Sequence, residues 1–416
     1  MAFPITETLI KGELSICADP SDKHAFRFLR TRRVDERPLT EPGSAAPDLV
    51  IFQVGQDLGF ADTLEGLPPQ LWASAQQGAG KVVFDASTEG KAHDPVSTDL
   101  LHAALRRAKV PIGRGVYITQ NRQYADDYRA YCRASGLSQG MRVVVYDYWI
   151  RRVLSEFEQS GPKVLEQRLE AFRQRAAHRP RRFLSLNFTP RPARLLFLTS
   201  LMQQGLWDQG FVSFGGFEQM ERRKDRSFAM IRQDFLKLPG FEDKTAALAP
   251  RLDQLAARGR SVLGDVPDKR SYQKILRPTD LAEYHRSWFS VVTETEMLNL
   301  PARITEKALK PLLNLHPFIM FANPGSLDLV RGLGFETFPE LVDESYDQEL
   351  EPSRRFELAF AELRRLCQLD EPALARTIGG LEEKLEFNAA WGLTRLPQKY
   401  ALELDEVLLA DVLAMD

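Results

Sequence analysis

A chain of 416 residues is longer than one ordinary hydrophobic core supports, so its length predicts two domains with an additional segment. Its formal net charge of −2 argues against a dedicated nucleic-acid-binding protein, which normally carries a basic excess. Hydrophobic residues make up 44% of the chain and charged residues 27%, which is the balance of an ordinary globular protein.

Cysteine usage and the N-terminal residues bear on the cellular compartment. Cys17, Cys132 and Cys367 lie far apart and form no Cys-x-x-Cys pair, so neither a disulfide framework nor a zinc knuckle is predicted. The first residues carry acids early and lack the basic and apolar regions of a secretory signal. No apolar run approaches the ~18 residues of a membrane-spanning helix. These features predict a cytoplasmic protein without a membrane span.

Four short apolar runs in the first part of the chain are predicted to be β-strands. They are almost continuously apolar rather than alternating, which is typical of parallel strands that are covered on both faces. Helical patterns alternate with them, so βαβ units are expected. A loop-like composition covers residues 37–48. The strand runs are 48–54, 81–87, 115–119 and 141–148, and the helical patterns are 97–109 and 124–136.

A charged, helix-forming segment separates this set from a second set of strands. It is broken by Gly161-Pro162, and we interpret it as a helical bridge. Only a helical periodicity remains after residue 345. The second set of predicted strands is 181–188, 210–216, 287–295 and 316–323, with a helical pattern over 191–207. The predicted fold is therefore α/β, with Rossmann-like, doubly wound domains over 1–148 and 181–345, the bridge over 149–180 and a helical tail over 346–416.

Polar residues follow the carboxyl end of a strand in the second set, where α/β sheets bind ligands next to helix N-termini. The strand ends at Asn187, and Arg191 and Arg194 flank the start of the next helix. Two arginines there could clamp a diphosphate through charge-assisted hydrogen bonds. The alternative is that both side chains are simply solvated.

A second group of polar residues follows the strand 287–295. This strand ends in Glu294 and Thr295, and a helix is predicted to begin at Thr305. Thr305 can serve as the N-cap, and Glu306 in the first turn is favoured by the helix dipole. Lys307 is not favoured there, because the dipole repels a cation at a helix N-terminus. A bound anion would remove this conflict.

The strand 316–323 is followed by the turn Asn323-Pro324-Gly325, with Ser326 able to cap the next helix. This turn could be ordinary turn chemistry, or it could bring the backbone close to a ligand.

Four sequence elements resemble the donor half of the fucosyltransferase-like glycosyltransferases of the GT-B fold. In chain order they are Asn187 with a downstream arginine, FSVVTET, ITEK and HPFIMFANPG. The later sequence GFETFPELVDESYD is similar to a tail of poorly characterised bacterial and phage relatives. The resemblance covers about residues 181–347 and implies two Rossmann-like domains that face each other across a cleft. It implies that the N-terminal domain binds the acceptor and the C-terminal domain the nucleotide sugar.

The resemblance also implies roles for individual residues. Glu306 would hold the ribose hydroxyls of the donor, and Lys307 with Arg194 or Arg191 would neutralise its pyrophosphate. Thr295 stands where the family has asparagine, so the nucleotide, GDP- or UDP-type, stays open. The implied reaction is the inverting transfer of a sugar to a hydroxyl of a glycan or glycoconjugate.

Glycosyl transfer requires neutralisation of the leaving diphosphate and a base for the acceptor hydroxyl. No convincing Asp-x-Asp motif follows a strand, so we predict that arginine and lysine replace a metal and that no cofactor is required. The base is expected at a strand end of the N-terminal domain. Glu89 is the first candidate and Asp85 the second, with His93 nearby. A capping or solvated loop acid is the alternative.

Two other functions stay open. The chain could be a glycosyltransferase that acts on protein or on modified DNA bases, although the weak net charge speaks mildly against DNA. It could also be a non-catalytic protein that binds nucleotide sugars or glycans. A dehydrogenase is not predicted, because no strand is followed by Gly-x-Gly-x-x-Gly.

Overall fold

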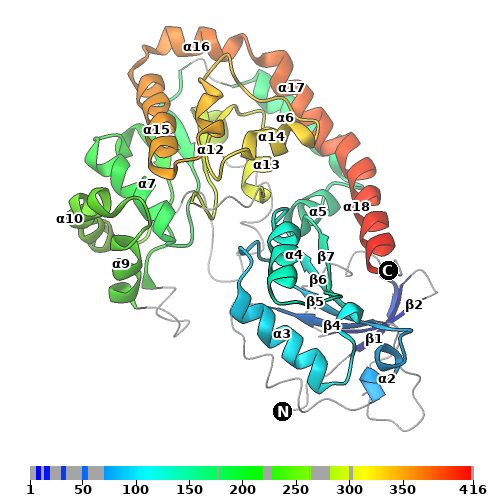
Figure 1. Ribbon diagram of the computed structural model, residues 1–416. Coiled ribbons are helices and arrows are strands. Elements are labelled where there is room, and N and C mark those ends of the chain that lie inside the picture. The colour runs from blue at the N-terminus through cyan, green and yellow to red at the C-terminus, as the bar shows by residue number, and fades with distance from the viewer. Residues whose placement is uncertain are drawn as a thin grey trace. The chain divides into compact units, whose positions relative to one another are not determined.

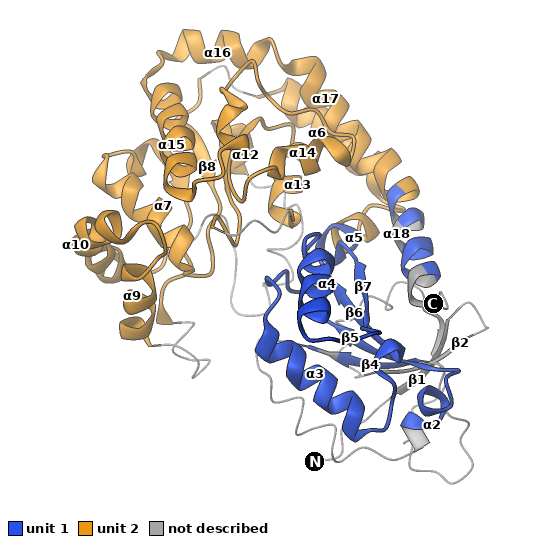
Figure 2. Cartoon of the chain, viewed as in Figure 1, with its two compact units in different colours: residues 1–151, 400–416 blue, residues 152–399 orange. Residues whose placement is uncertain are grey.

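The computed structural model of the protein divides into two compact units, which Figure 2 shows in blue and orange. Unit 1 contains residues 1–151 and 400–416, and unit 2 contains residues 152–399. The loop predicted over 37–48 lies outside the described residues. The structure describes residues 6–10, 14–18, 30–33, 49–54, 70–175, 178–218, 227–261, 263, 282–298 and 303–413.

Unit 1 is built on a seven-stranded sheet whose parallel strands follow chain order (Figure 1). Its strands are β1 (Thr6–Ile10), β2 (Leu14–Ala18), β3 (Arg30–Arg33), β4 (Leu49–Gln53), β5 (Lys81–Asp85), β6 (Gly115–Thr119) and β7 (Arg142–Val145). The sheet order is β3-β1-β2-β4-β5-β6-β7. All neighbours from β2 to β7 are parallel, whereas β1 is antiparallel to both β2 and β3. Right-handed crossovers that progress in one direction place their helices on the same face.

The two faces of this sheet bury separate hydrophobic clusters. On one face, Trp72 of α2 (Gln70–Gln76), Leu101 of α3 (Pro95–Arg107) and Tyr128 of α4 (Tyr124–Ala134) pack in one cluster with the strands. On the other face, Ile118 packs with Leu408 of α18 (Leu396–Leu413) and with the start of α5 (Tyr148–Ser155). Both faces are covered, as the sequence predicts, but the end of the chain supplies the second layer.

A buried ion pair holds α18 on this face. The Arg151 guanidinium donates from Nε and Nη2 to the two carboxylate oxygens of Asp405, at 3.1 and 2.9 Å. The Tyr146 hydroxyl donates to the same carboxylate at 3.3 Å. Nearby, the Tyr400 hydroxyl donates to Asp147 at 2.8 Å. Because these groups are shielded from water, each depends on its partner for hydrogen bonding.

Unit 2 is built on a four-stranded parallel sheet whose strand order reverses. Its strands are β8 (Arg181–Ser185), β9 (Gly210–Val212), β10 (Ser287–Thr293) and β11 (Phe318–Phe321), in the order β11-β10-β8-β9. From β8 the chain moves to β9 on one side and then returns to β10 on the other. This reversal is the topological switch point of a doubly wound sheet, where ligands bind at the carboxyl ends of the two diverging strands.

Besides its sheet, the described part of unit 2 contains helices from each part of its sequence. In the part of the chain that the structure describes, no helix combines the length and the apolarity that a membrane crossing requires. The helices are α6 (Gly161–Arg173), α7 (Pro192–Gln203), α9 (Phe228–Leu236), α10 (Glu242–Arg258), α12 (Ala282–His285), α13 (Glu306–Leu313), α14 (Ser326–Gly332), α15 (Pro352–Gln368), α16 (Glu371–Gly379) and α17 (Glu382–Ala390).

The predicted α/β class with two Rossmann-like units is confirmed. All eight predicted strands are present, and most are shorter than predicted because the residues at their ends turn out of the sheet. The sequence analysis missed β1, β2 and β3. Their sequences, TETLI, LSICA and RTRR, contain no continuous apolar run, since polar residues interrupt each of them. A cleft between the two units stays a prediction.

We predict that Asp405→Ala releases α18 from unit 1. Removing one partner of a buried ion pair leaves the other charge uncompensated, and such losses typically cost about 3–5 kcal/mol. Urea unfolding would measure the lost stability, and hydrogen exchange should localise the loss of protection to α18 and β7. The control is Glu406→Ala, which removes an exposed acid from the same helix. Equal stability of the two variants would contradict the role of the ion pair.

Candidate functional site

The residues at the switch point of unit 2 are tied together by hydrogen bonds. Asn187, just after β8, donates from Nδ2 to the Ser185 hydroxyl at 2.9 Å and accepts at Oδ1 from the Thr293 hydroxyl at 2.6 Å. Its backbone N–H donates to the Ser213 hydroxyl, just after β9, at 2.9 Å. Asn187 therefore joins the carboxyl ends of three strands, and its amide is engaged within the protein.

The carboxylate that follows β10 caps the next helix. Glu294 is 4% exposed and accepts from the Thr305 N–H at 3.0 Å and from the Thr305 hydroxyl at 2.7 Å. The Thr305 oxygen accepts in turn from the Lys307 N–H at 3.4 Å, which confirms Thr305 as the N-cap. Glu294 and Thr305 thus fix the first turn of α13 at the end of β10.

Glu306 and Lys307 contact each other in this first turn. Nζ of Lys307 lies 3.1 Å from Oε1 of Glu306 and also donates to the Thr305 hydroxyl oxygen at 2.9 Å. Burial alone would raise the pKa of Glu306, but the positive charges of Lys307, Lys310 and Arg194 outweigh it and lower that pKa to about 2. The buried carboxylate is therefore ionised and held among cations.

Arg194 is the arginine that acts on this carboxylate. It lies in the first turn of α7, is 5% exposed, and donates to the Thr189 carbonyl at 3.4 Å. It also donates to the Thr295 hydroxyl at 3.3 Å, so it links α7 to the residues after β10. Arg191 occupies the N-cap position of α7 and is half-buried. The positive charges that act on Glu306 thus belong to Arg194, Lys307 and Lys310.

Lys310 is a site residue that the sequence analysis missed. It lies one turn after Glu306 on α13 and is 8% exposed. Burial lowers the pKa of Lys310 to about 8, although the Glu306 charge acts in the opposite direction. The spacing of Glu306 and Lys310 could have pointed to this residue, since residues four apart on a helix share one face. Buried apolar neighbours on α13, such as Leu309 and Leu312, mark that helix as core rather than surface.

Among the described residues, this cluster brings three cations together with two carboxylates. The carboxylates are Glu294 and Glu306, and the cations are Arg194, Lys307 and Lys310. All except Lys307 are buried, and only 19% of the Lys307 side chain is exposed. Buried charge that is not balanced is costly, and the N-terminus of α13 adds to the positive potential. The switch point is therefore suited to an anion.

The two carboxylates proposed as a base in unit 1 differ in exposure. Asp85 ends β5, is 1% exposed, and accepts from the Ser87 N–H at 2.8 Å. Glu89 lies in the following loop and is half-buried. His93 contacts the Thr98 hydroxyl at 3.0 Å, and burial lowers its pKa, so its ring is neutral near pH 7. Asp85 thus holds a turn, whereas Glu89 offers the more accessible carboxylate.

Metal ligands and thiols are two further kinds of functional group. In the described ranges, no three or more His, Cys, Asp or Glu side chains are grouped so that they could hold a metal ion. Cys132 and Cys367 are both unbridged, and burial raises the pKa of Cys367 to about 12. The Cys367 thiol is therefore unreactive. Independence from metal stays a prediction.

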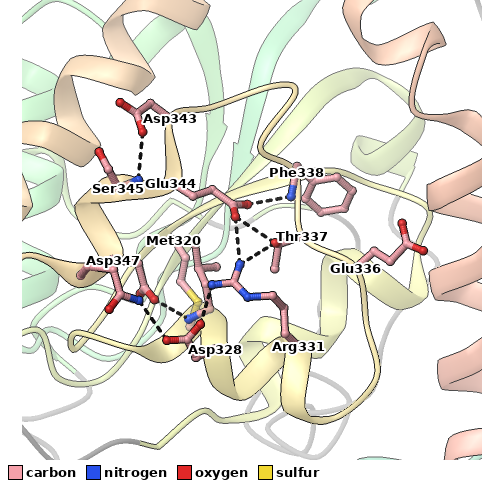
Figure 3. Close-up of polar contacts among 12 residues, drawn as sticks. Met320, Asp328, Arg331, Glu336, Thr337, Phe338, Asp343, Glu344, Ser345 and Asp347 are labelled. Carbon is pink, nitrogen blue, oxygen red and sulfur yellow. Dashed lines mark hydrogen bonds and ion pairs between the residues drawn. The ribbon is translucent and has the colours of Figure 1, made fainter.

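The segment 334–347, which carries GFETFPELVDESYD, acts as a structural clamp (Figure 3). The Glu344 carboxylate accepts from the Phe338 N–H at 2.7 Å, the Thr337 hydroxyl at 2.8 Å and Nη1 of Arg331 at 3.0 Å. Arg331 also pairs with Asp328 of α14 at 2.7 Å. One carboxylate thus closes the segment on itself and joins it to α14.

The same segment caps α14. The side-chain carboxylate of Asp347 accepts from the Leu327 N–H at 3.0 Å, and the backbone carbonyl of Asp347 accepts from the Gly325 N–H at 2.8 Å. Gly325 has a φ of 73°, a left-handed conformation that glycine adopts readily. The Ser326 hydroxyl donates back to the Asn323 carbonyl at 2.7 Å, so the prediction that Ser326 caps this helix was wrong. Asp347 takes that role from 21 residues away along the chain.

No protein-family model matches the chain, and no curated protein matches it. Solved structures to which the chain is similar include α,α-trehalose 6-phosphate synthase from Burkholderia multivorans, with a TM-score of 0.39 and 12% identity, covering 87% of this chain and 71% of that chain. They also include the UDP-forming α,α-trehalose-phosphate synthase from Burkholderia vietnamiensis, with a TM-score of 0.39 and 12% identity. That match covers 88% of this chain and 74% of the synthase chain. The catalytic domain of starch synthase IV from Arabidopsis thaliana, bound to ADP and acarbose, has a TM-score of 0.38 and 12% identity. That match covers 98% of this chain and 87% of the starch synthase chain.

We predict that Asp347→Asn stabilises the protein at pH 7 but not at pH 4. Burial raises the pKa of Asp347 to about 6 from an unfolded value of 3.8, so the folded state binds the proton more tightly. The ionised carboxylate therefore lowers the free energy of unfolding increasingly as pH rises from about 4 to 6, by up to about 3 kcal/mol. Asparagine retains an acceptor for the Leu327 N–H without this dependence.

Urea unfolding of the parent and the variant between pH 4 and 7 would measure the difference. The effect should be absent in Glu336→Gln, which alters an exposed acid of the same segment. A parent and variant whose stabilities stay parallel over this range would contradict the assignment.

Proposed function

We propose that the chain is a cytoplasmic GT-B glycosyltransferase that moves a sugar from a nucleotide sugar to a hydroxyl of a glycan or glycoconjugate. The observation that carries the proposal is the group of three cations and two carboxylates at the switch point of unit 2, in which Lys307 is the part-exposed cation and Glu306 an ionised carboxylate among the cations. A nucleoside diphosphate offers the two matching parts. Its diphosphate suits the cations, and its ribose hydroxyls suit the carboxylate.

Donor binding would replace the contact between Glu306 and Lys307. In the protein without ligand these side chains pair at 3.1 Å. With a donor, Lys307 and Arg194 would turn to the diphosphate, and Glu306 would accept from two ribose hydroxyls. Negative charge grows on the leaving diphosphate in the transition state, so the cations would lower the barrier as well as bind the donor.

The order of the four motifs supports the fucosyltransferase-like family: the first three meet at this switch point, and the fourth forms β11 beside β10. Asn187, Glu294 and Thr305 are proposed to position the site, because their polar groups bond to one another and to neighbouring strands. Inverting transfer also needs a base for the acceptor hydroxyl. We assign this role to Glu89 of unit 1 ahead of Asp85, because Asp85 is buried in a turn.

Binding and turnover of nucleotide sugars test the proposal. Calorimetry with UDP, GDP, ADP and dTDP identifies the nucleotide, and release of that nucleotide from its sugar conjugates measures turnover with and without glycan acceptors. Binding with turnover supports a glycosyltransferase. Binding without turnover indicates a non-catalytic nucleotide-sugar-binding protein, and absence of binding contradicts the assigned site.

Glu306→Gln should separate the ribose role from a purely electrostatic one. The loss of charge-assisted bonds to the ribose weakens nucleoside diphosphate binding by about 1.5–3 kcal/mol. The same change removes a negative charge beside three cations, so inorganic pyrophosphate should bind at least as tightly as before. The preference for nucleoside diphosphate over pyrophosphate therefore falls, and calorimetry with both ligands measures it.

The matched control is Glu340→Gln, which removes another lysine-paired glutamate from unit 2, exposed and on the clamp segment. It should leave both affinities unchanged. If Glu306→Gln alters the two affinities by the same factor, the carboxylate only balances charge and does not bind ribose.

Activity should survive removal of divalent metal. Arg194, Lys307 and the N-terminus of α13 supply positive charge where the leaving diphosphate is proposed to lie, so the reaction does not need a metal there. Turnover would be compared before and after dialysis against EDTA. Loss of activity that manganese or magnesium restores would show that a metal takes part.

A further inference from the structure

The most unusual charged group of the site is Lys310. Lys310 is 8% exposed, and lysine is one of the residue types that are least often fully buried. With Lys307 and Thr293 it lines a cavity of about 30 Å³ between the sheet and α13. That volume has room for one water molecule beside the two ammonium groups. Lys310 and Lys307 thus line the same cavity between α13 and the sheet.

The charges that act on Lys310 come from three elements. On α13 they are Glu306, which favours the ammonium, and Lys307, which opposes it. From α7, Arg194 opposes it, and after β10, Glu294 favours it. Burial is the largest influence and also opposes the charged form. Two neighbouring cations and burial therefore act together against the proton on this amine.

We propose that Lys310 is a third cation of the donor site and that it takes up a proton when a nucleoside diphosphate binds. This inference rests on the proposed function and adds a regulation by pH to it. A diphosphate beside Lys307 brings at least two negative charges into the cluster, which offset the repulsion from Lys307 and Arg194. The ammonium form of Lys310 is then favoured, either directly or through a water in the cavity.

The direction of the pH effect follows from the lowered pKa of about 8. Below pH 8 the amine already carries its proton, so binding takes up little. Above pH 8 a growing fraction of the protein molecules must take up a proton in order to bind, so the affinity for the diphosphate falls as pH rises. With a bound-state pKa near the usual 10.4, the dissociation constant should rise about tenfold between pH 7.5 and pH 9.

Titration calorimetry on the full chain tests this, with UDP, GDP and pyrophosphate as probes. Runs at pH 8.5 in two buffers of different ionisation enthalpy give the number of protons exchanged. About 0.7 proton should be taken up per bound diphosphate. In UDP and GDP the terminal phosphate, with a second pKa of about 6, is already ionised at this pH and does not contribute. Pyrophosphate still carries part of its last proton there, so the proton count is taken from UDP and GDP and pyrophosphate serves to measure affinity.

Two variants attribute the proton to Lys310. Lys310→Arg keeps the charge in a group that does not titrate below pH 12, so binding should persist without proton uptake. Lys310→Met removes the charge, so the dissociation constant should rise about tenfold or more at pH 7.5 and lose its pH dependence between pH 7.5 and 9. The arginine variant keeps the test decisive if the methionine variant fails to fold.

The outcomes distinguish this inference from the proposed function. Binding without proton uptake by the parent, or uptake that persists in Lys310→Arg, overturns the role of Lys310 and leaves the donor site intact. If none of the three probes binds to the parent at pH 7.5, the donor site itself is wrong, and the inference falls with it.

Discussion

An ionised carboxylate held among three cations, where the strand order of a parallel sheet reverses, is the interaction on which the account of this protein depends. Glu306 has a pKa of about 2 because Lys307, Lys310 and Arg194 outweigh the effect of its burial. Such a cluster is costly to bury, and an apolar cluster of similar volume would often be as stable or more so. Its location at the carboxyl ends of β8 and β10 gives a functional reason for that cost, since ligands bind there in doubly wound sheets.

Hydrogen bonds at the strand ends position this cluster, and Glu294 takes part both in these bonds and in its charge balance. Asn187 joins the strand ends, and Glu294 holds the first turn of α13 through Thr305. On the other side of β10, the clamp segment 334–347 caps α14 through Asp347. Polar groups that are satisfied by one another keep the backbone in one arrangement, which a site for a two-part ligand requires.

Much of the fold could be predicted from the sequence, because buried parallel strands read as continuous apolar runs. The strands β1 to β3 on one side of the unit 1 sheet could not, since polar residues interrupt each of them. The N-cap at Thr305 was predictable from local rules, whereas the cap of α14 was not. That cap comes from Asp347, which only the tertiary structure brings to the helix. Lys310 was missed for a related reason, because its importance comes from burial beside Glu306 rather than from any motif.

The segment GFETFPELVDESYD shows how a recognisable motif can serve the fold. Its Glu344 bonds to Phe338, Thr337 and Arg331, and its Asp347 bonds to the first turn of α14. These contacts account for its acidic residues without a ligand. By contrast, ITEK places Glu306 and Lys307 in a cluster where, among the described residues, three cations meet two carboxylates. Charge balance is therefore what separates a structural motif from a candidate binding motif in this unit.

The central claim is that the cation cluster at the β8–β10 switch point binds the diphosphate of a nucleotide. A crystal structure of the full chain with UDP or GDP tests it most directly. We expect phosphate oxygens within hydrogen-bond distance of Lys307 and Arg194, a ribose against Glu306, and no remaining contact between Glu306 and Lys307. A nucleotide bound elsewhere, with the pair of Glu306 and Lys307 intact, would contradict it.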